Sequence, residues 1–187
     1  PLRAKQVILF FGQIKEVKGL DLLIEAFSLI YKDYPNAQLV IAGRVWKDNY
    51  LKYQNLIVER GIEDQVNSHI RYIADDEVGT FYSAADVVVL PYRRIYQSGV
   101  LLMAMSYGIP VITSDLDAMK EIVDDRDNGF LFKSGDYVDL ACVLRGVLID
   151  EDVRHQAAKN ALTKMEDDFN WLGIGKKIAQ IYSGLAI

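Results

Sequence analysis

The chain has 187 residues, of which 51% are hydrophobic, and its 21 Lys+Arg against 26 Asp+Glu give a formal net charge of −5. A chain of this length buries roughly 70% of its unfolded surface and needs no staple to fold. The single cysteine, Cys142, excludes a disulfide scaffold and favours a reducing compartment. The acidic balance disfavours non-specific nucleic-acid binding, and no apolar run approaches the ~20 residues of a membrane span. Since the chain starts with proline and shows no signal peptide, we expect a fragment of a longer cytoplasmic product.

Strand-length apolar runs alternate with helical periodicity through the first half of the chain. An amphipathic helix follows the first strand, because its apolar positions recur every 3.6 residues, and Pro35 ends it, since the residue before a proline avoids helical backbone. The predicted order is strand, helix, strand, helix, strand and the start of a short helix, at 7–11, 19–34, 38–42, 48–60, 70–73 and 75–77.

The second half repeats the pattern and then becomes helical. A near-continuous apolar run, Val87–Leu90, is typical of a strand buried on both faces. Cys142 falls on the apolar face of a late helix, where we expect it in the core. The predicted order is strand, helix, strand, helix and strand, followed by three helices, at 86–90, 98–107, 110–113, 118–124, 129–132, 136–148, 151–166 and 170–184.

Six short strands that alternate with helices predict an α/β fold. The expected architecture is a doubly wound, mostly parallel six-stranded sheet of Rossmann-like type, in three αβα layers with extra C-terminal helices. Ligands of such sheets bind beyond the carboxyl ends of the strands. The candidate site therefore lies in the loops that follow strands, at 12–19, 43–47, 73–77, 91–100 and 113–118.

The first of these loops places two lysines and two glycines between a strand and a helix. Lys15 and Lys18 could reach anionic oxygens, while Gly12 permits a tight turn and Gly19 a close backbone approach. The loop has neither the dinucleotide glycine fingerprint nor the Walker lysine pattern. By itself the loop favours a solvated surface turn over a phosphate contact.

The loop after the fourth strand is more informative, because Gln97-Ser98-Gly99 stands where a helix begins. Ser98 can cap that helix, and Gly99 removes side-chain bulk, so that free backbone N–H groups can meet a phosphate. The helix dipole adds ~0.3–1 kcal/mol for a nearby anion, and Arg93 and Arg94 are nearby cations. The alternative is a well-capped buried helix with no ligand.

Other reactive side chains favour no chemistry of their own. His69 and His155 are isolated and lack metal-ligand spacing, and Ser98 has no histidine in a triad context. The acidic segment 124–129 lacks the remaining glutamate of a calcium loop, which favours a solvated turn. We therefore expect no metal and no cofactor.

Taken in order, these landmarks resemble the carboxyl-terminal, nucleotide-sugar-binding domain of family 4 glycosyltransferases, enzymes of the GT-B fold with two facing Rossmann-like domains. The resemblance covers nearly the whole chain. It rests on a lysine-glycine loop with the first helix, a strand ending in glycine, the fourth strand, a glycine-x-proline-valine signature and three later segments, at 18–27, 39–43, 84–91, 108–112, 121–123, 128–132 and 135–136.

The resemblance implies that Lys18 contacts the diphosphate of the donor. Gln13 stands where the family usually has arginine, so Lys15 is expected to serve as the second cation. The expected diphosphate site comprises Gly12, Gln13, Lys15, Lys18, Gln97, Ser98, Gly99 and Val100. The expected contacts to base, ribose and sugar are Gly43, Arg44, Ile73, Ile95 and Met103.

One departure from the family pattern concerns two glutamates, eight positions apart, that flank the helix start in most members. Here these positions are Ile95 and Met103, so neither carboxylate is present. Asp117 and Ala118 also replace the paired glycines before Glu121. A subset of the family carries a similar Gln-Ser-Gly-Val loop without the glutamates, which keeps the assignment.

The expected function is a retaining glycosyltransferase that moves a hexosyl group from a nucleotide-diphosphate sugar to a glycan or lipid-linked acceptor. Residues 1–187 would form a single donor-binding domain, inactive alone, with the N-terminal acceptor domain absent from this chain. The full-length protein would be cytoplasmic and would not bind nucleic acid. Association with the inner face of a membrane stays open.

Other classes remain as alternatives. The missing glutamates favour a non-catalytic nucleotide-binding or scaffold module derived from the same fold. A receiver domain of flavodoxin type would need clustered acids after the first strand, and a nicotinamide-dependent dehydrogenase would need its glycine fingerprint; this chain has neither. UDP, GDP and ADP all remain open as the nucleotide.

Overall fold

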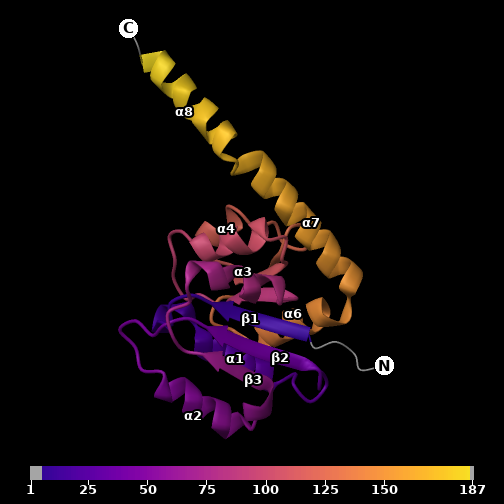
Figure 1. Ribbon diagram of the computed structural model, residues 1–187. Helices are drawn as coiled ribbons and strands as arrows, with labels where there is room; N and C mark the ends of the chain where they lie inside the picture. Colours follow the sequence, from indigo (N-terminus) through magenta and orange to yellow (C-terminus); the bar gives the residue numbers. More distant parts are fainter. Residues whose placement is uncertain (1–5, 186–187) are drawn as a thin grey trace.

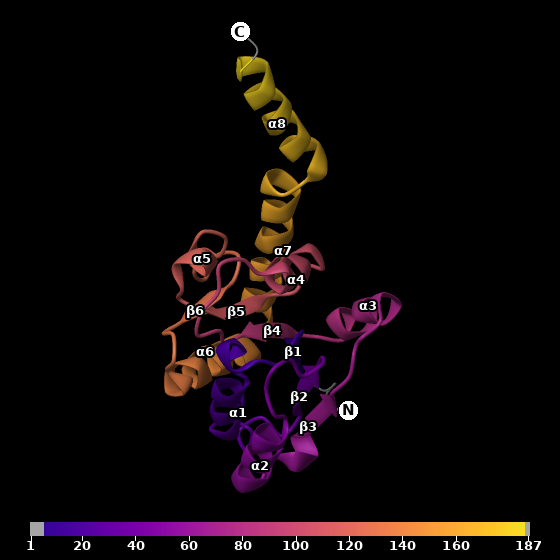
Figure 2. The same cartoon turned by 90° about the vertical axis from the view of Figure 1, so that its left-hand side faces the viewer.

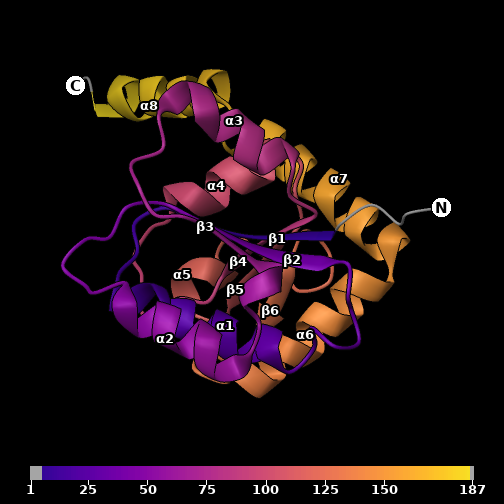
Figure 3. The same ribbon diagram turned by 60° about the horizontal axis from the view of Figure 1, so that its bottom comes forward.

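The computed structural model describes residues 6–185, and its centre is one six-stranded sheet in which every neighbouring pair of strands is parallel. The strand order is β3-β2-β1-β4-β5-β6, and Figure 3 shows this sheet between two layers of helices. The strands are β1 (Gln6–Phe11), β2 (Ala37–Ala42), β3 (Val66–His69), β4 (Val87–Leu90), β5 (Val111–Ser114) and β6 (Phe130–Phe132).

Helices cover both faces of the sheet, because successive residues of a strand point to opposite sides. In β1, Ile8 and Phe10 enter one hydrophobic core and Leu9 enters the other. The first core is closed by α1 (Leu20–Ser28), α2 (Leu51–Arg60) and α6 (Tyr137–Ile149). The second is closed by α3 (Asp75–Ser83), α4 (Gly99–Ser106), α5 (Asp117–Lys120) and α7 (Glu151–Asp168). The predicted three-layer, doubly wound fold is confirmed.

The winding of the chain reverses between β1 and β4. From β1 the chain passes outward through β2 and β3, and it then returns to β4 on the other side of β1. At such a reversal the loops that leave the two central strands diverge, and the crevice between them is the usual ligand site of an open parallel sheet. The fold thus directs attention to the loops after β1 and β4.

The last helix, α8 (Trp171–Leu185), leaves the body of the molecule. Figures 1 and 2 show it projecting beyond α7, away from the sheet. It carries large exposed apolar side chains, including Trp171 at 87% and Tyr182 at 71% exposure. Of the helices in the described part of the chain, none combines the length and hydropathy that a membrane crossing requires.

The third strand is not where the sequence predicted it. The predicted strand was 70–73, whereas β3 occupies Val66–His69 and pairs residue by residue with β2. As the edge strand it exposes Asn67 and Ser68, so its composition is polar and its apolar signal weak. Residues 70–73 instead lead into α3, and Ile73 is buried in the second core.

Three smaller predictions were also wrong. The first helix ends at Ser28, and turns follow it where helix was expected up to residue 34. The helix expected at 118–124 is only the four-residue α5. Cys142 is exposed, because α6 buries the stripe that contains Ala141 and Leu144. In each case the local pattern was apolar enough for helix or core, and the tertiary contacts decided otherwise.

Candidate functional site

Three loops at the carboxyl edge of the sheet meet through backbone contacts at glycines. A Cβ on Gly43 would lie 1.8 Å from the carbonyl oxygen of Gly12, and one on Gly19 would lie 1.9 Å from that of Pro91. Gly43 and Gly19 have φ values of +148° and +66°, which side chains disfavour. A Cβ on Gly12 would lie 3.3 Å from Val100 Cγ2. The loop after β1 therefore touches both the loop after β2 and the start of α4.

Ile14 fixes the first part of the loop after β1. It is fully buried, its N–H donates to the Arg44 carbonyl at 2.9 Å, and its carbonyl accepts from the Trp46 N–H at 3.0 Å. Lys15 then places its ammonium 5.9 Å from the centroid of a Trp46 ring, and the Arg44 guanidinium carbon lies 5.3 Å from a ring centroid of the same residue. Two cations thus share one partly exposed indole.

Lys18 ends the short 3-10 helix η1 (Glu16–Lys18), and its ammonium lies 3.6 Å from the centroid of the Tyr92 ring. Burial, and to a smaller extent the charge of Lys15, lower the pKa of Lys18 to about 8. Within residues 6–185, no ion pair includes Lys15 or Lys18. A partly desolvated ammonium without a carboxylate is unfavourable until an anion approaches it.

Arg93, which the sequence placed among the cations near the helix start, is committed elsewhere. Its guanidinium donates to both carboxylate oxygens of Asp21 at 2.7 and 2.6 Å, and to the Glu16 carbonyl at 3.2 Å. Its backbone N–H also donates to the Val17 carbonyl at 2.9 Å. Arg93 therefore holds the loop after β1 in place. Arg94 is exposed like Arg93, but it enters no ion pair within residues 6–185.

The start of α4 is built as the sequence predicted. Ser98 is 6% exposed, and its Oγ accepts from the Leu101 N–H at 3.2 Å, which caps the helix. The first backbone hydrogen bond of the helix runs from Leu102 N–H to the Ser98 carbonyl. The N–H groups of Gly99 and Val100 precede that bond and have no backbone partner in the described part of the chain. They are available to an anionic group, and Gln97, just before the cap, is exposed.

The five residues expected around base, ribose and sugar come from three segments: the loop after β2, the residues before α3, and the loop after β4 with α4. Gly43 and Arg44 follow β2 and lie next to the loop that carries Lys15, with Arg44 exposed to solvent. Ile73 and Ile95 pack on the second core, and Ile73 is only 7% exposed. Met103 is 42% exposed on α4. Gly43 and Arg44 contact the loop after β1 through Gly12 and Ile14, and Gln13 lies half-buried within that loop.

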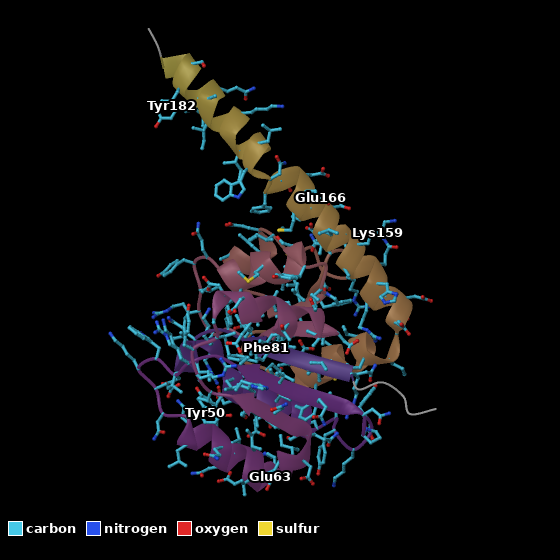
Figure 4. The ribbon with its side chains drawn as sticks, in the orientation of Figure 1. Tyr50, Glu63, Phe81, Lys159, Glu166 and Tyr182 are labelled. Carbon is cyan, nitrogen blue, oxygen red and sulfur yellow. The ribbon has the colours of Figure 1, made fainter. Side chains whose placement is uncertain are left out.

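Sequence reasoning missed an aromatic cluster at the ends of β1 and β3. The ring centroids of His69 and Phe81 lie 5.1 Å apart, those of Phe11 and Phe81 6.0 Å, and those of Phe11 and Tyr82 5.0 Å. Phe81, on α3, is labelled in Figure 4. His69 is the last residue of β3, and the misplacement of that strand by four residues hid its position. Tyr92 was also missed, although it directly follows a buried strand and Pro91.

Two hollows of the surface lie near or beyond this edge, and the second borders it through Glu16 and Arg93. One of ≈ 410 Å³ lies between α7 and the 124–128 turn, and one of ≈ 380 Å³ lies between α2 and Arg93. Neither of these two hollows is lined by Lys18 or Ser98. In the described residues, no three His, Cys, Asp or Glu side chains are arranged to hold a metal ion.

The fold and this edge define a Rossmann-like domain that offers cations and free helix N–H groups to an anionic ligand. The family model described as "Glycosyl transferases group 1" matches residues 3–164. The chain therefore belongs to the group 1 glycosyltransferase family, and the predicted resemblance is confirmed. The match to the family model ends at residue 164, before α8 begins.

Individual relatives agree with this assignment. An uncharacterized glycosyltransferase of Methanocaldococcus jannaschii is 30% identical over 95% of this chain and 45% of its own length. The C-terminal domain of the group 1 glycosyltransferase LpcC from Francisella tularensis is 27% identical, with a TM-score of 0.81 over 90% of this chain and 88% of that one.

A third likeness concerns the fold alone. Anabaena HepE, solved with UDP and glucose, is 24% identical, with a TM-score of 0.85 over 96% of this chain and 48% of that one. The chain spans about half the length of the curated relatives that it matches.

Proposed function

We propose that this chain is the donor-binding part of a retaining glycosyltransferase that transfers a hexosyl group from a nucleotide-diphosphate sugar to a glycan or lipid-linked acceptor. The observation that carries the proposal is Lys18, which is half-buried and forms no ion pair within residues 6–185, at the edge where the N–H groups of Gly99 and Val100 have no partner among the same residues. Family membership and the solved complex of HepE with UDP support the nucleotide-sugar class.

The chemistry follows from charge. When the bond between the sugar and the nucleotide diphosphate breaks, negative charge develops on the leaving phosphate. Lys18 and Lys15 would stabilise that charge from one side, and the N–H groups of Gly99 and Val100 from the other. Groups held in place before the reaction need no reorganisation when the charge appears. We propose that this arrangement works without a metal ion or cofactor.

Residues outside this chain complete the proposal. We expect the acceptor to be bound mainly by an N-terminal domain of a longer protein, which would be cytoplasmic and peripheral to the inner face of a membrane. Retention of configuration is tested on that longer protein by following the anomeric proton of the first product by NMR. An inverted product would contradict the retaining mechanism.

Donor binding is tested on the present chain by calorimetric titration with UDP, GDP and ADP, each against its nucleoside. We expect saturable binding of one diphosphate and much weaker binding of its nucleoside, because the contacts proposed here are made to phosphate. Equal affinity for a diphosphate and its nucleoside would remove the edge between β1 and β4 from the donor site.

A second candidate function rests on the residues at positions 95 and 103. Isoleucine and methionine cannot hold ribose hydroxyls or a sugar through a carboxylate, which favours a module that binds nucleotide without transfer. Incubation of the longer protein with a radiolabelled donor distinguishes the two candidates. Binding without either transfer or donor hydrolysis supports the non-catalytic module.

A further inference from the structure

Tyr92 touches both halves of the site described above. It follows Pro91 directly after β4 and is 1% exposed. One face of its ring lies 3.6 Å, centroid to ammonium, from Lys18. Burial raises the pKa of the Tyr92 hydroxyl to about 12. The nearby Ser98 side chain acts in the opposite direction and lowers that pKa. The residue therefore stands between the loop after β1 and the cap of α4.

The ring provides what Lys18 otherwise lacks. A cation within ≈ 6 Å of an aromatic centroid is attracted by the electrons of the ring face, and the attraction grows when water is excluded. Since Lys18 is partly desolvated and forms no ion pair with the described residues, the Tyr92 face is a strong local influence on where its ammonium rests. A carboxylate at this place would neutralise the lysine, whereas a ring leaves its charge available to a ligand.

The backbone around Tyr92 keeps this contact in register. Gly19, next to Lys18, allows a close approach to the Pro91 carbonyl. On the other side of Tyr92, the Arg93 N–H donates to the Val17 carbonyl at 2.9 Å. The residues before and after the ring are thus tied to the residues around the lysine, and neither partner can shift alone.

The hydroxyl has a smaller part in this arrangement. It is buried and makes no hydrogen bond of good geometry with any residue in 6–185, while Ser98 Oγ accepts from the Leu101 N–H. The ring, and not the phenol oxygen, carries the contact with Lys18. Phenylalanine in place of Tyr92 should therefore keep the contact with Lys18, and leucine should lose it.

We propose that Tyr92 is a positioning residue for the diphosphate site, whose ring holds the Lys18 ammonium beside the first turn of α4. The proposal rests on the proposed function, because it assigns Tyr92 a role in the binding of the same diphosphate. It makes Tyr92 act through Lys18, and that dependence can be measured.

The test is a double-mutant cycle with UDP and uridine as probes. We expect Tyr92→Leu to lower the affinity for UDP about three- to thirtyfold and to change the affinity for uridine less than twofold. We expect Tyr92→Phe to bind UDP within twofold of the wild-type affinity. In a Lys18→Met background, Tyr92→Leu should change UDP affinity less than twofold. An equal loss in both backgrounds, or no loss in either, would overturn the proposal.

A second measurement needs no substitution and so does not depend on whether the leucine variant folds. A ring face at this distance shifts nearby protons upfield, so the ε-methylene protons of Lys18 in the wild-type chain should resonate clearly upfield of those of the exposed Lys159. Coincident resonances would overturn the contact. If UDP, GDP and ADP each bind the wild-type chain no more tightly than their nucleosides, the proposed function fails, while the resonance of Lys18 still decides the contact with Tyr92. If GDP or ADP is the diphosphate preferred, it and its nucleoside replace UDP and uridine in the cycle.

Discussion

Two neighbouring regions of this molecule treat their cations in opposite ways. On the flank formed by α1, α2 and the residues 48–50 that lead into α2, cations meet carboxylates: Arg60 pairs with Glu25 at 2.7 Å and Lys52 with Asp48 at 2.6 Å. At the edge formed by the loops after β1, β2 and β4, Lys15, Lys18 and Arg44 enter no ion pair with the described residues, and aromatic rings lie beside them instead.

The difference teaches how to separate structural charge from functional charge in an acidic chain. A paired surface cation contributes little to stability and is screened by water. An unpaired cation that is also partly buried costs stability, so it persists where something outside the chain completes it. Arg93 marks the boundary between the regions, since it leaves the edge loop and pairs with Asp21 at 2.6 Å.

The largest expected effect concerns backbone contact, which only the edge has. Gly43→Ala should destabilise the fold by more than about 3 kcal/mol, because its Cβ would lie 1.8 Å from the Gly12 carbonyl oxygen. Gly61→Ala, at the end of α2, should lower the free energy of unfolding by about 1–2 kcal/mol. Its φ of +63° is unfavourable for alanine, but the added Cβ would meet no neighbour within 4 Å in the described structure. Denaturant unfolding of both variants measures this; equal losses would contradict the close packing of the loops.

The next effect concerns the two lysines of the comparison. Lys18→Ala should weaken UDP about ten- to a hundredfold and uridine hardly at all, since a charged hydrogen bond to phosphate contributes about 1.5–3 kcal/mol. Lys52→Ala is the matched control on the flank, and it should leave UDP affinity unchanged. Calorimetry on the three chains decides the point, and a similar loss in the control would erase the distinction between edge and flank.

A smaller effect is the pH dependence of donor binding. Since the pKa of Lys18 is lowered to about 8, the lysine is charged below that pH and loses its proton above it. UDP affinity should be nearly flat below pH 7, fall about twofold between pH 7 and 8, and then fall by up to tenfold per unit, because the anion binds the charged form. The phosphate, with a second pKa near ~6, is already ionised there. The Lys18→Met chain should show a much smaller fall over the same range.

The smallest effect lies on the flank. Burial acts to raise the pKa of Asp48, but hydrogen bonds from Lys52, Tyr53 and the Asn49 N–H outweigh it and leave the pKa lowered. A lowered pKa contributes stability above the unfolded value near 3.8, and that stability is lost as pH falls through the folded value. Asp48→Asn should therefore destabilise the chain at pH 7 and make less difference near pH 2. Thermal melting at both pH values checks this, with UDP affinity at pH 7 unchanged.

Much of the fold and part of the site could be predicted from the chain itself. The six strands, their alternation with helices and the doubly wound class follow from apolar periodicity, which records burial one element at a time. Ser98 as a cap and Gly19 as a point of close approach follow from local backbone chemistry, and both are confirmed. These features depend on residues near one another in sequence.

Other features were set by contacts between distant segments. β3 lies four residues before its predicted place because pairing with β2, and not apolar content, decides an edge strand. Cys142 is exposed because α6 rests on a neighbouring stripe. Arg93 turns to Asp21, 72 positions away in the chain.

The sequence by itself determined that this is a Rossmann-like member of its family with cations at one edge, because periodicity, turn residues and motif order are local properties. Only the tertiary structure decided which of those cations remain unpaired, and that Tyr92 lies under Lys18. Pairing and desolvation depend on what folding places within a few ångströms, and separation along the chain carries no record of that distance.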